Sequence, residues 1–166
     1  MACKHDSHEV KQSEIQKANE THLAGFEKWL KRKGFSQKTI NKHVSNVDFY
    51  INDYLCYYDL IDASQGYGHI HGFLGNWFIR KAAWASCAQI KSFAASIKKF
   101  YTFLLDESVV THECLDCLCE TIKEFMPEWL DNMRRYEDLI FEERRRYEEK
   151  VFEEIRRSGF MLFKNR

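Results

Sequence analysis

The segment Ile90–Ser108 has the sequence IKSFAASIKKFYTFLLDES and carries different residues on its two sides. Its large apolar residues recur three or four positions apart, which predicts an amphipathic helix that faces a core. They are Ile90, Ala94, Ile97, Phe100 (with Tyr101) and Leu104. The opposite side carries Lys91, Ala95, Lys98 and Thr102 and no acid. It is either a solvated face or a face that contacts a negatively charged partner.

The composition of the rest of the chain favours the same class of structure. The chain has 166 residues, of which 45% are hydrophobic and 15% aromatic, with 1 Pro and 7 Gly. This is enough apolar material for one compact domain with an appendage, and few residues break helices. We therefore expect an all-α protein with short connections.

Periodic apolar residues and capping residues predict six helices. The expected spans are Ser13–Lys33, Gln37–Leu60, Ile70–Ala83, a helix capped by Ser86 that contains the opening segment, His112–Met133 and Arg134–Arg157. Gly34 suits the end of the first helix, and Ser36 suits the start of the second. Pro127 lies inside the fifth apolar pattern and should break or kink it. The predicted organisation is a flexible tail at 1–12, a helical domain at 13–108 and a helical extension at 109–166.

The charges are balanced overall but unevenly distributed. The chain has 25 basic and 25 acidic residues, so the net charge indicates no nucleic-acid partner. However, no acid occurs between Lys28 and Val47 or between Ala63 and Leu105, and both stretches contain several bases. They create local positive fields that the totals hide.

No apolar run is long enough to span a membrane, and the N-terminal residues are polar. We therefore expect a cytoplasmic protein without a membrane partner. In that compartment the six cysteines are expected to be thiols.

Two segments together resemble the N-terminal, SAM-like core-binding domain of tyrosine recombinases (phage integrases). The first is FEKWLKRKGFSQKTINKHVSNVDFYINDYL, and the second is SCAQIKSFAASIKKFYTFLLDES. The positions that match the first helix pair are Leu30, Gly34, Ser36, Thr39, Ile40, Val44, Phe49 and Leu55. Those that match the fourth helix are Ser86, Ile90, Ile97, Phe100, Tyr101, Phe103 and Leu104. The resemblance covers Leu23–Ser108 and implies a SAM-like four-helix bundle, followed here by two additional C-terminal helices.

The resemblance does not extend to catalysis. The recombinase catalytic domain carries a His-x-x-Arg element and a tyrosine nucleophile, whereas no histidine here has an arginine three residues later. The 58 residues after Ser108 are too few for that domain. The resemblance therefore implies a non-enzymatic DNA-binding module, an accessory or regulator of DNA recombination or integration.

In the family, the second and fourth helices face DNA. Carried over by position, the DNA-binding residues would be Lys38, Asn41, Lys42, Ser45, Ser86, Gln89, Lys91, Lys98 and Lys99. Lysines and helix N-termini bind phosphates, and Asn and Gln can contact base edges. The alternative is a helical protein-interaction or homo-oligomerisation module without nucleic-acid binding. In that case the apolar line of the last helix would form the interface, as in a homodimer.

Two further clusters of Cys and His residues are candidate metal sites. The segment HECLDCLCE brings His112, Cys114, Cys117 and Cys119 together, and CKHDSH at residues 3–8 could supply further ligands. A closed zinc site needs four ligands in tetrahedral reach, whereas a helix turns Cys119 away from Cys117. His69 and His71 suit a loop. We therefore expect no metal and no cofactor.

Overall fold

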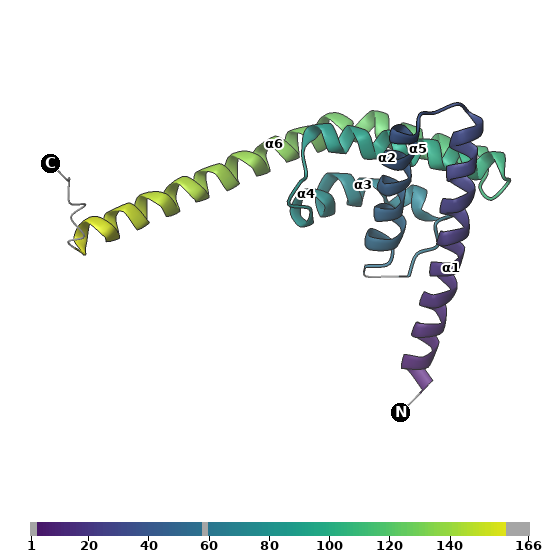
Figure 1. Ribbon diagram of the computed structural model, residues 1–166, viewed down its shortest axis with the longest axis horizontal. Helices are drawn as coiled ribbons and strands as arrows, with labels where there is room; N and C mark the ends of the chain where they lie inside the picture. The colour runs from purple at the N-terminus through teal and green to yellow at the C-terminus, as the bar shows by residue number, and fades with distance from the viewer. Residues whose placement is uncertain (1–2, 58–59, 159–166) are drawn as a thin grey trace.

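The computed structural model describes residues 3–57 and 60–158, with the backbone alone for residues 3–9. Every regular element in this part of the chain is helical, which confirms the all-α class. Figure 1 shows a body of packed helices from which the last helix extends far to one side. The elements are α1 (Cys3–Arg32), α2 (Gln37–Asp48), the π-helical turn η1 (Phe49–Tyr54), the 3₁₀ turn η2 (Gly66–His69), α3 (Ile70–Gly72), the π-helical turn η3 (Phe73–Trp77), α4 (Phe78–Lys81), α5 (Cys87–Asp106) and α6 (His112–Arg157).

The first helix begins earlier than the sequence predicts. α1 starts at Cys3 and not at Ser13, so the predicted start of the first helix is wrong. The buried Ile15 lies near the expected start and anchors the N-terminal half of α1 against the body. Polar residues before it continue the helix, because a helix propagates more easily than it nucleates.

Three local signals place the next helices as predicted. Gly34 has φ +81°, and Phe35 N donates to the Leu30 carbonyl at 3.3 Å, which closes the end of α1. Ser36 Oγ accepts from the Thr39 amide at the start of α2. Ser86 Oγ accepts from the Gln89 amide at the start of α5. The predicted starts of α2 and α5 are confirmed.

Two π-helical turns place aromatic rings in the core. η1 continues α2, and η3 interrupts the helical stretch from α3 to α4. Tyr50 in η1 and Phe73 in η3 have ring centroids 4.9 Å apart, and Tyr54 lies 5.0 Å from the same Phe73 ring. A π turn inserts an extra residue per turn, which rotates the side chains that follow it. Apolar periodicity alone does not reveal such turns.

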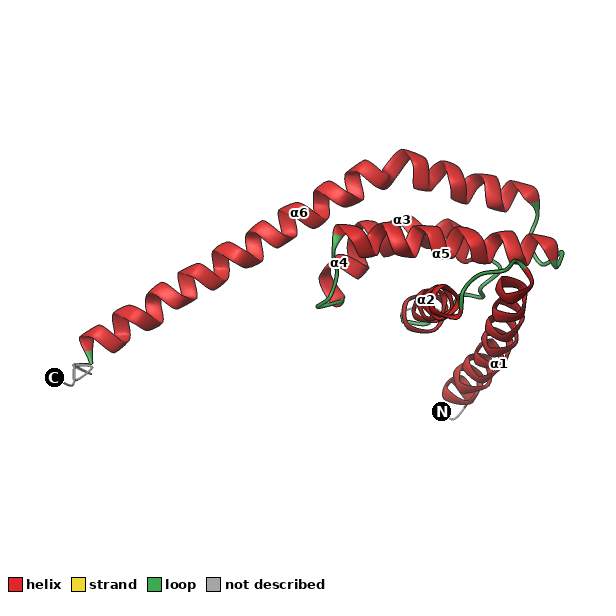
Figure 2. Ribbon diagram, turned by 45° about the horizontal axis from the view of Figure 1, so that its top comes forward, coloured by secondary structure: helices red, strands yellow, loops and turns green. Residues whose placement is uncertain are grey.

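The C-terminal region is one helix of 46 residues, so the prediction of two additional helices is wrong. Pro127 lies inside α6, and Figure 2 shows the helix changing direction without a break. Proline has no N–H to donate to the Lys123 carbonyl four residues earlier. Both residues are exposed, so a water molecule can donate to that carbonyl in its place. Leu118 and Trp129 are buried on either side of Pro127. Their packing keeps both halves helical.

Contacts with the π turn η3 and its neighbours hold the first half of α6 to the body. Trp129 Nε1 donates to His71 Nδ1 at 3.0 Å, and Asn132 Nδ2 donates to the Gly75 carbonyl at 3.4 Å. A Cβ at Gly75 would lie 2.9 Å from the Trp129 ring, so glycine permits this close approach. The C-terminal half of α6 extends away from the body (Figures 1 and 2). No helix among the described residues is both long and apolar enough to span a bilayer.

Candidate nucleic-acid interface

The two helices that carry the predicted DNA-binding residues pack directly against each other. α2 crosses α5 steeply, since Figure 2 views α2 nearly end-on while α5 lies across the page. We call their line of contact the α2–α5 seam. Its polar residues are Lys42, His43, Asn46, Ser92, Ser96 and Lys99.

A hydrogen-bonded hub lies at the base of the seam. The fully buried Ser96 hydroxyl contacts His43 Nδ1 at 2.8 Å and accepts from Asn46 Nδ2 at 2.9 Å. It donates its single proton to the Ser92 carbonyl at 2.9 Å. With the Ser96 proton donated to this carbonyl, the contact between Nδ1 and Oγ is a hydrogen bond when His43 carries its proton on Nδ1. The hub fixes how α2 and α5 are positioned relative to each other.

Two lysines from different helices lie on either side of this hub. Burial lowers the pKa of the His43 imidazole, and the charges of Lys99 and Lys42 lower that pKa further. The Phe35 and His43 rings meet edge-on, with their centroids 6.0 Å apart. Lys99 Nζ also lies 4.9 Å from the centroid of the Phe35 ring, just before α2. The seam thus has positive charge from both helices on one side of the molecule.

The other predicted residues of α2 are exposed on its outer surface. Lys38 stands one turn before Lys42, and Ser45 stands one turn after Asn41. The side-chain oxygen Oδ1 of Asn41 accepts a hydrogen bond from Gln37 Nε2 at 2.7 Å. These side chains extend the polar surface of the seam along α2.

The predicted residues of α5 do not all face the seam. Ser86 and Gln89 lie at the helix start, where the Ser86 hydroxyl is used in capping. Lys91 stands four residues after Cys87, whose thiol contacts the Leu130 carbonyl of α6 at 3.6 Å, so Lys91 borders α6. Lys98 precedes Lys99 by one residue and is rotated from it by roughly 100°. The structure therefore brings Lys42 and Lys99 together and leaves Lys91 and Lys98 on a different face.

An exposed tryptophan lies at one end of the seam. The Trp84 ring stacks on Phe93 with centroids 5.9 Å apart and lies 5.4 Å from Phe49. It keeps 50% of its surface exposed. The ring thus contacts residues of η1 and α5 while one of its sides stays open. A flat, exposed aromatic surface can stack against a base or a sugar.

Sequence reasoning missed the hub because its members look like core residues. His43 and Ser96 lie among apolar positions of two separate helices, and their pairing depends on how the helices cross. The available signal was the presence of polar side chains at buried positions, which must find partners. Asn46 and Ser92 gave the same signal.

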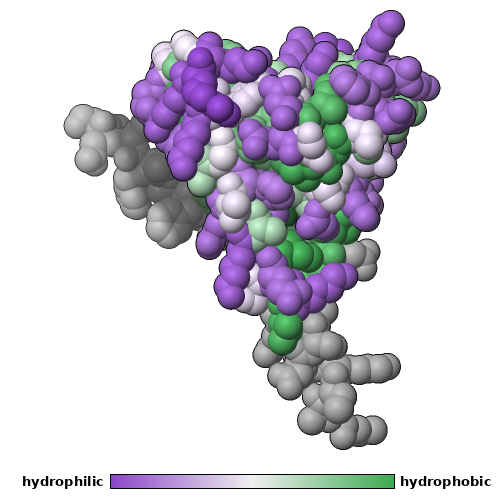
Figure 3. Space-filling model, turned by 90° about the vertical axis from the view of Figure 1, so that its right-hand side faces the viewer, coloured by the Kyte–Doolittle hydropathy of each residue, from purple (hydrophilic) through white to green (hydrophobic). Residues whose placement is uncertain are grey.

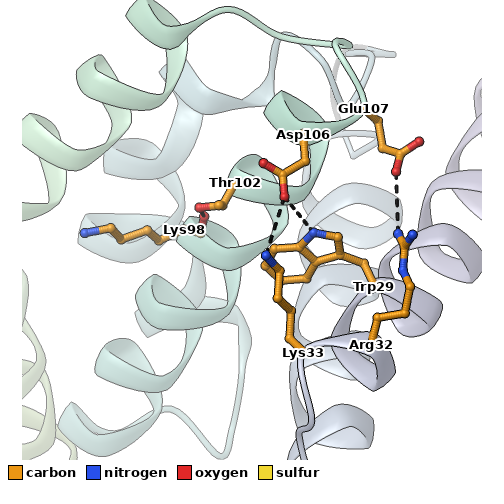
Figure 4. A network of polar contacts seen from close by, with 7 residues as sticks. All are labelled: Trp29, Arg32, Lys33, Lys98, Thr102, Asp106 and Glu107. Atoms are coloured by element: carbon orange, nitrogen blue, oxygen red, sulfur yellow. Dashed lines mark hydrogen bonds and ion pairs between the residues drawn. The ribbon is translucent and has the colours of Figure 1, made fainter.

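Acids at the end of α5 offset other basic residues of the Lys28–Val47 stretch. Figure 4 shows Asp106 Oδ2 accepting from Trp29 Nε1 at 2.8 Å and lying 3.9 Å from Lys33 Nζ. Arg32 lies 3.8 Å from Glu107 in the same view. Figure 3 shows the end of the molecule with α1 and the α5–α6 turn as a mainly hydrophilic surface. Acids thus offset Arg32 and Lys33, whereas Lys38 and Lys42 of α2 form no ion pair within the described residues.

The Lys98 side chain points away from Asp106 in Figure 4. Within the described residues, no ion pair involves Lys38, Lys42, Lys91, Lys98 or Lys99. These ammonium groups are therefore available to an external anion.

The cysteine cluster does not form a metal centre in the described part of the chain. There, no group of three His, Cys, Asp or Glu side chains is placed to hold an ion. Cys114 lies 3.6 Å from the Thr111 hydroxyl, and this hydrogen bond is the main cause that lowers the pKa of the thiol. His71 is used as an acceptor for Trp129. The side chains of Cys3, His5 and His8 lie outside the described residues.

Comparison of the chain with protein-family models, with curated proteins and with solved structures gave no match. The resemblance to the recombinase core-binding domain thus rests on the sequence positions given above.

Proposed function

We propose that the chain is a non-enzymatic DNA-binding module that contacts duplex DNA through the α2–α5 seam. Such a module would be an accessory or regulator of DNA recombination or integration, as the resemblance to the core-binding domain implies. The observation that carries the proposal is the position of Lys42 and Lys99. They come from different helices and border one pair of rings: Lys42 directly precedes His43, and Lys99 Nζ lies 4.9 Å from the centroid of Phe35, whose ring is 6.0 Å from that of His43.

The charge around the seam supports an anionic ligand. The nearest acid in the α2 sequence is Asp48, whose carboxylate accepts from Asn52 at 2.6 Å. No acid occurs between Ala63 and Leu105, which includes most of α5. A phosphate near Lys42 and Lys99 therefore meets lysines, hydroxyls and amides, and the negative charge of Asp48 lies at the far end of α2, six residues after Lys42.

The hydrogen bonds at the base of the seam hold the two lysine-bearing helices in a fixed arrangement, which favours a defined position for a bound phosphate. Ser96 connects His43 and Asn46 of α2 to α5, so Lys42 and Lys99 extend from a fixed frame. Lysines that bind phosphates set affinity and register, while exposed amides and an aromatic ring can contact bases or sugars. Two to four phosphate contacts give a weak non-specific interaction, with Kd of roughly 10⁻⁴–10⁻⁶ M at physiological salt.

The test measures binding of a labelled duplex of about 20 base pairs over a range of salt concentrations from about 50 mM upward. Each phosphate contact contributes about 0.9 to the slope of log K against log salt. Replacing both Lys42 and Lys99 with alanine should therefore reduce the slope by about 1.8. The matched control replaces Lys91 and Lys98, which removes the same charge from a different face of α5.

The control variant should keep most of the slope of the unmodified chain. Equal losses from the two double variants would show general electrostatic attraction and refute a site at the seam. Absence of binding at about 50 mM salt would refute the DNA-binding function itself.

A further inference from the structure

The second half of α6 leaves several large apolar side chains uncovered. We call Arg134–Arg157 the α6 arm; it extends beyond the body in Figures 1 and 2. Phe141, Tyr147 and Phe152 are 68–70% exposed. Leu139, Ile140 and Ile155 are 42–56% exposed. An isolated helix with this much exposed apolar surface gains stability when a partner covers it.

The apolar residues of the arm repeat every 11 positions. Tyr136 is followed by Tyr147, Ile140 by Val151, and Phe141 by Phe152. Eleven residues make three turns of 3.67 residues, so these pairs stay on one face of a slightly right-handed supercoil. The side chains of the arm therefore form a continuous stripe suited to another long helix. Leu139 lies outside this stripe.

Apart from Phe141 and Phe152, which lie along one edge of it, the stripe is symmetric about the midpoint between Arg145 and Arg146. Tyr136 and Ile155 are equally far from that midpoint, and so are Ile140 and Val151. An antiparallel copy of the arm centred there therefore places apolar side chains opposite apolar side chains. This property is what a two-fold symmetric, self-complementary interface requires.

The same arrangement gives the central charged residue of the stripe a partner. Arg144 and Tyr147 are related by the same midpoint, so each arginine would lie against the tyrosine of the other copy. Guanidinium groups stack favourably on aromatic rings. A parallel, in-register pair would instead place Arg144 against its own copy. The charges thus favour the antiparallel orientation.

A groove at the base of the arm completes the fit. It has a volume of ≈ 520 Å³, and its lining residues include Ile79 and Ala82 of the body together with Tyr136, Ile140, Phe141 and Arg144 of α6. In the antiparallel arrangement Ile155 of a second copy reaches Tyr136, at the edge of this groove. The partner's helix end would thus cover the apolar surface where α6 leaves the body.

The area available is sufficient for a stable contact. An aromatic side chain can bury about 150–250 Å², and three of them on each arm are about two-thirds exposed. A pair of arms would therefore remove roughly 600–1,000 Å² from water through aromatic rings alone. The aliphatic side chains bring the total above the roughly 1,000 Å² expected of a specific interface.

We infer that the α6 arm pairs with the α6 arm of a second copy of this chain as an antiparallel two-helix interface. The inference is independent of DNA binding. It is tested by sedimentation equilibrium of the full chain over about 1–100 µM, where a dimer with micromolar Kd is measurable.

Adjacent positions supply matched variants. Ile140→Lys places a charge in the stripe and should raise the dimer Kd at least about tenfold, a change of about 1.4 kcal/mol. Leu139→Lys makes the same change of charge on a residue outside the stripe that is 56% exposed, against 42% for Ile140, and should change Kd less than about threefold. Circular dichroism checks that both variants stay helical.

A photo-crosslinking residue at position 140 determines the orientation. An antiparallel pair gives a crosslink to the peptide that contains Val151, whereas a parallel pair gives a crosslink between two copies of position 140. A monomer at every concentration would overturn the inference. Equal effects of the two lysine variants would overturn the assigned stripe, and the parallel crosslink would overturn the orientation.

Discussion

Removal of the Ser96 hydroxyl tests the hub that joins α2 to α5. In the Ser96→Ala variant, His43 Nδ1 loses its 2.8 Å partner inside a buried environment. Asn46 Nδ2 loses one of two acceptors and keeps the Ser92 hydroxyl at 3.0 Å. The change removes a single oxygen and leaves the apolar packing in place. Its cost therefore reports the hydrogen bonds.

The expected loss of stability follows from these contacts. A buried donor without a partner costs about 1–3 kcal/mol, and the second bond to Asn46 adds about 0.5–1 kcal/mol. Alanine recovers about 0.5 kcal/mol through its higher helix propensity. The net loss in the free energy of unfolding should be about 2 kcal/mol. With a urea m-value of about 2 kcal/mol/M, the unfolding midpoint should fall by about 1 M.

Urea unfolding followed by circular dichroism measures this shift, and Thr102→Ala is the matched control. The Thr102 hydroxyl also donates to a carbonyl four residues earlier in α5, that of Lys98, but it is only half-buried and connects no second helix. Its loss should change stability by less than about 0.5 kcal/mol.

A second variant isolates the cost of the unpaired ring. His43→Leu combined with Ser96→Ala removes both polar partners, and should cost less than Ser96→Ala alone if the orphaned imidazole is the cause. Equal shifts for Ser96→Ala and Thr102→Ala would refute the reasoning, because the hub would then contribute nothing beyond an ordinary helix hydroxyl.

Three further perturbations test other parts of the structure. Asp106→Ala leaves the buried Trp29 indole N–H without its 2.8 Å acceptor and should cost about 1–3 kcal/mol in urea unfolding. The folded state lowers the pKa of His43 below its ordinary value of 6.5, so the unfolded chain binds more protons. Stability should therefore fall as the pH drops below 6.5, and His43→Leu should flatten that dependence in a pH series of thermal unfolding. Gly75→Ala introduces a Cβ 2.9 Å from the Trp129 ring and should cost about 1–3 kcal/mol, with faster hydrogen exchange in the first half of α6.

Local signals in the sequence predicted much of the fold. Ser36, Ser86 and Gly34 act on their own neighbouring amides and backbone angles, so their effect does not depend on the rest of the structure. The sequence predicts two helices in the C-terminal region and a break or kink at Pro127. One helix forms because the packing of Leu118 and Trp129 on either side of the proline outweighs the lost hydrogen bond. The π turns were missed since apolar spacing does not distinguish a wide turn from an ordinary one.

The candidate site was predictable only in part. The resemblance identified α2 and α5, and the helix periodicity made Lys42 and Lys98 surface residues. Which lysine of α5 approaches α2 depends on the crossing of the two helices, and the hub with His43 and Ser96 determines it. The sequence gives no direct measure of that crossing. Lys99, next to Lys98 in the chain, is the one that faces the seam.

The continuity of α6 through Pro127 fixes the rotational phase of the arm relative to the body. Deleting one residue between Trp129 and Tyr136 would shorten the helix by about 1.5 Å and turn every later side chain by about 100°. The stripe would then point in another direction although none of its residues had changed. Insertion of 11 residues makes three almost complete turns, so it would restore the direction and move the arm about 16 Å outward. Length changes in this stretch should therefore be tolerated in steps of whole turns.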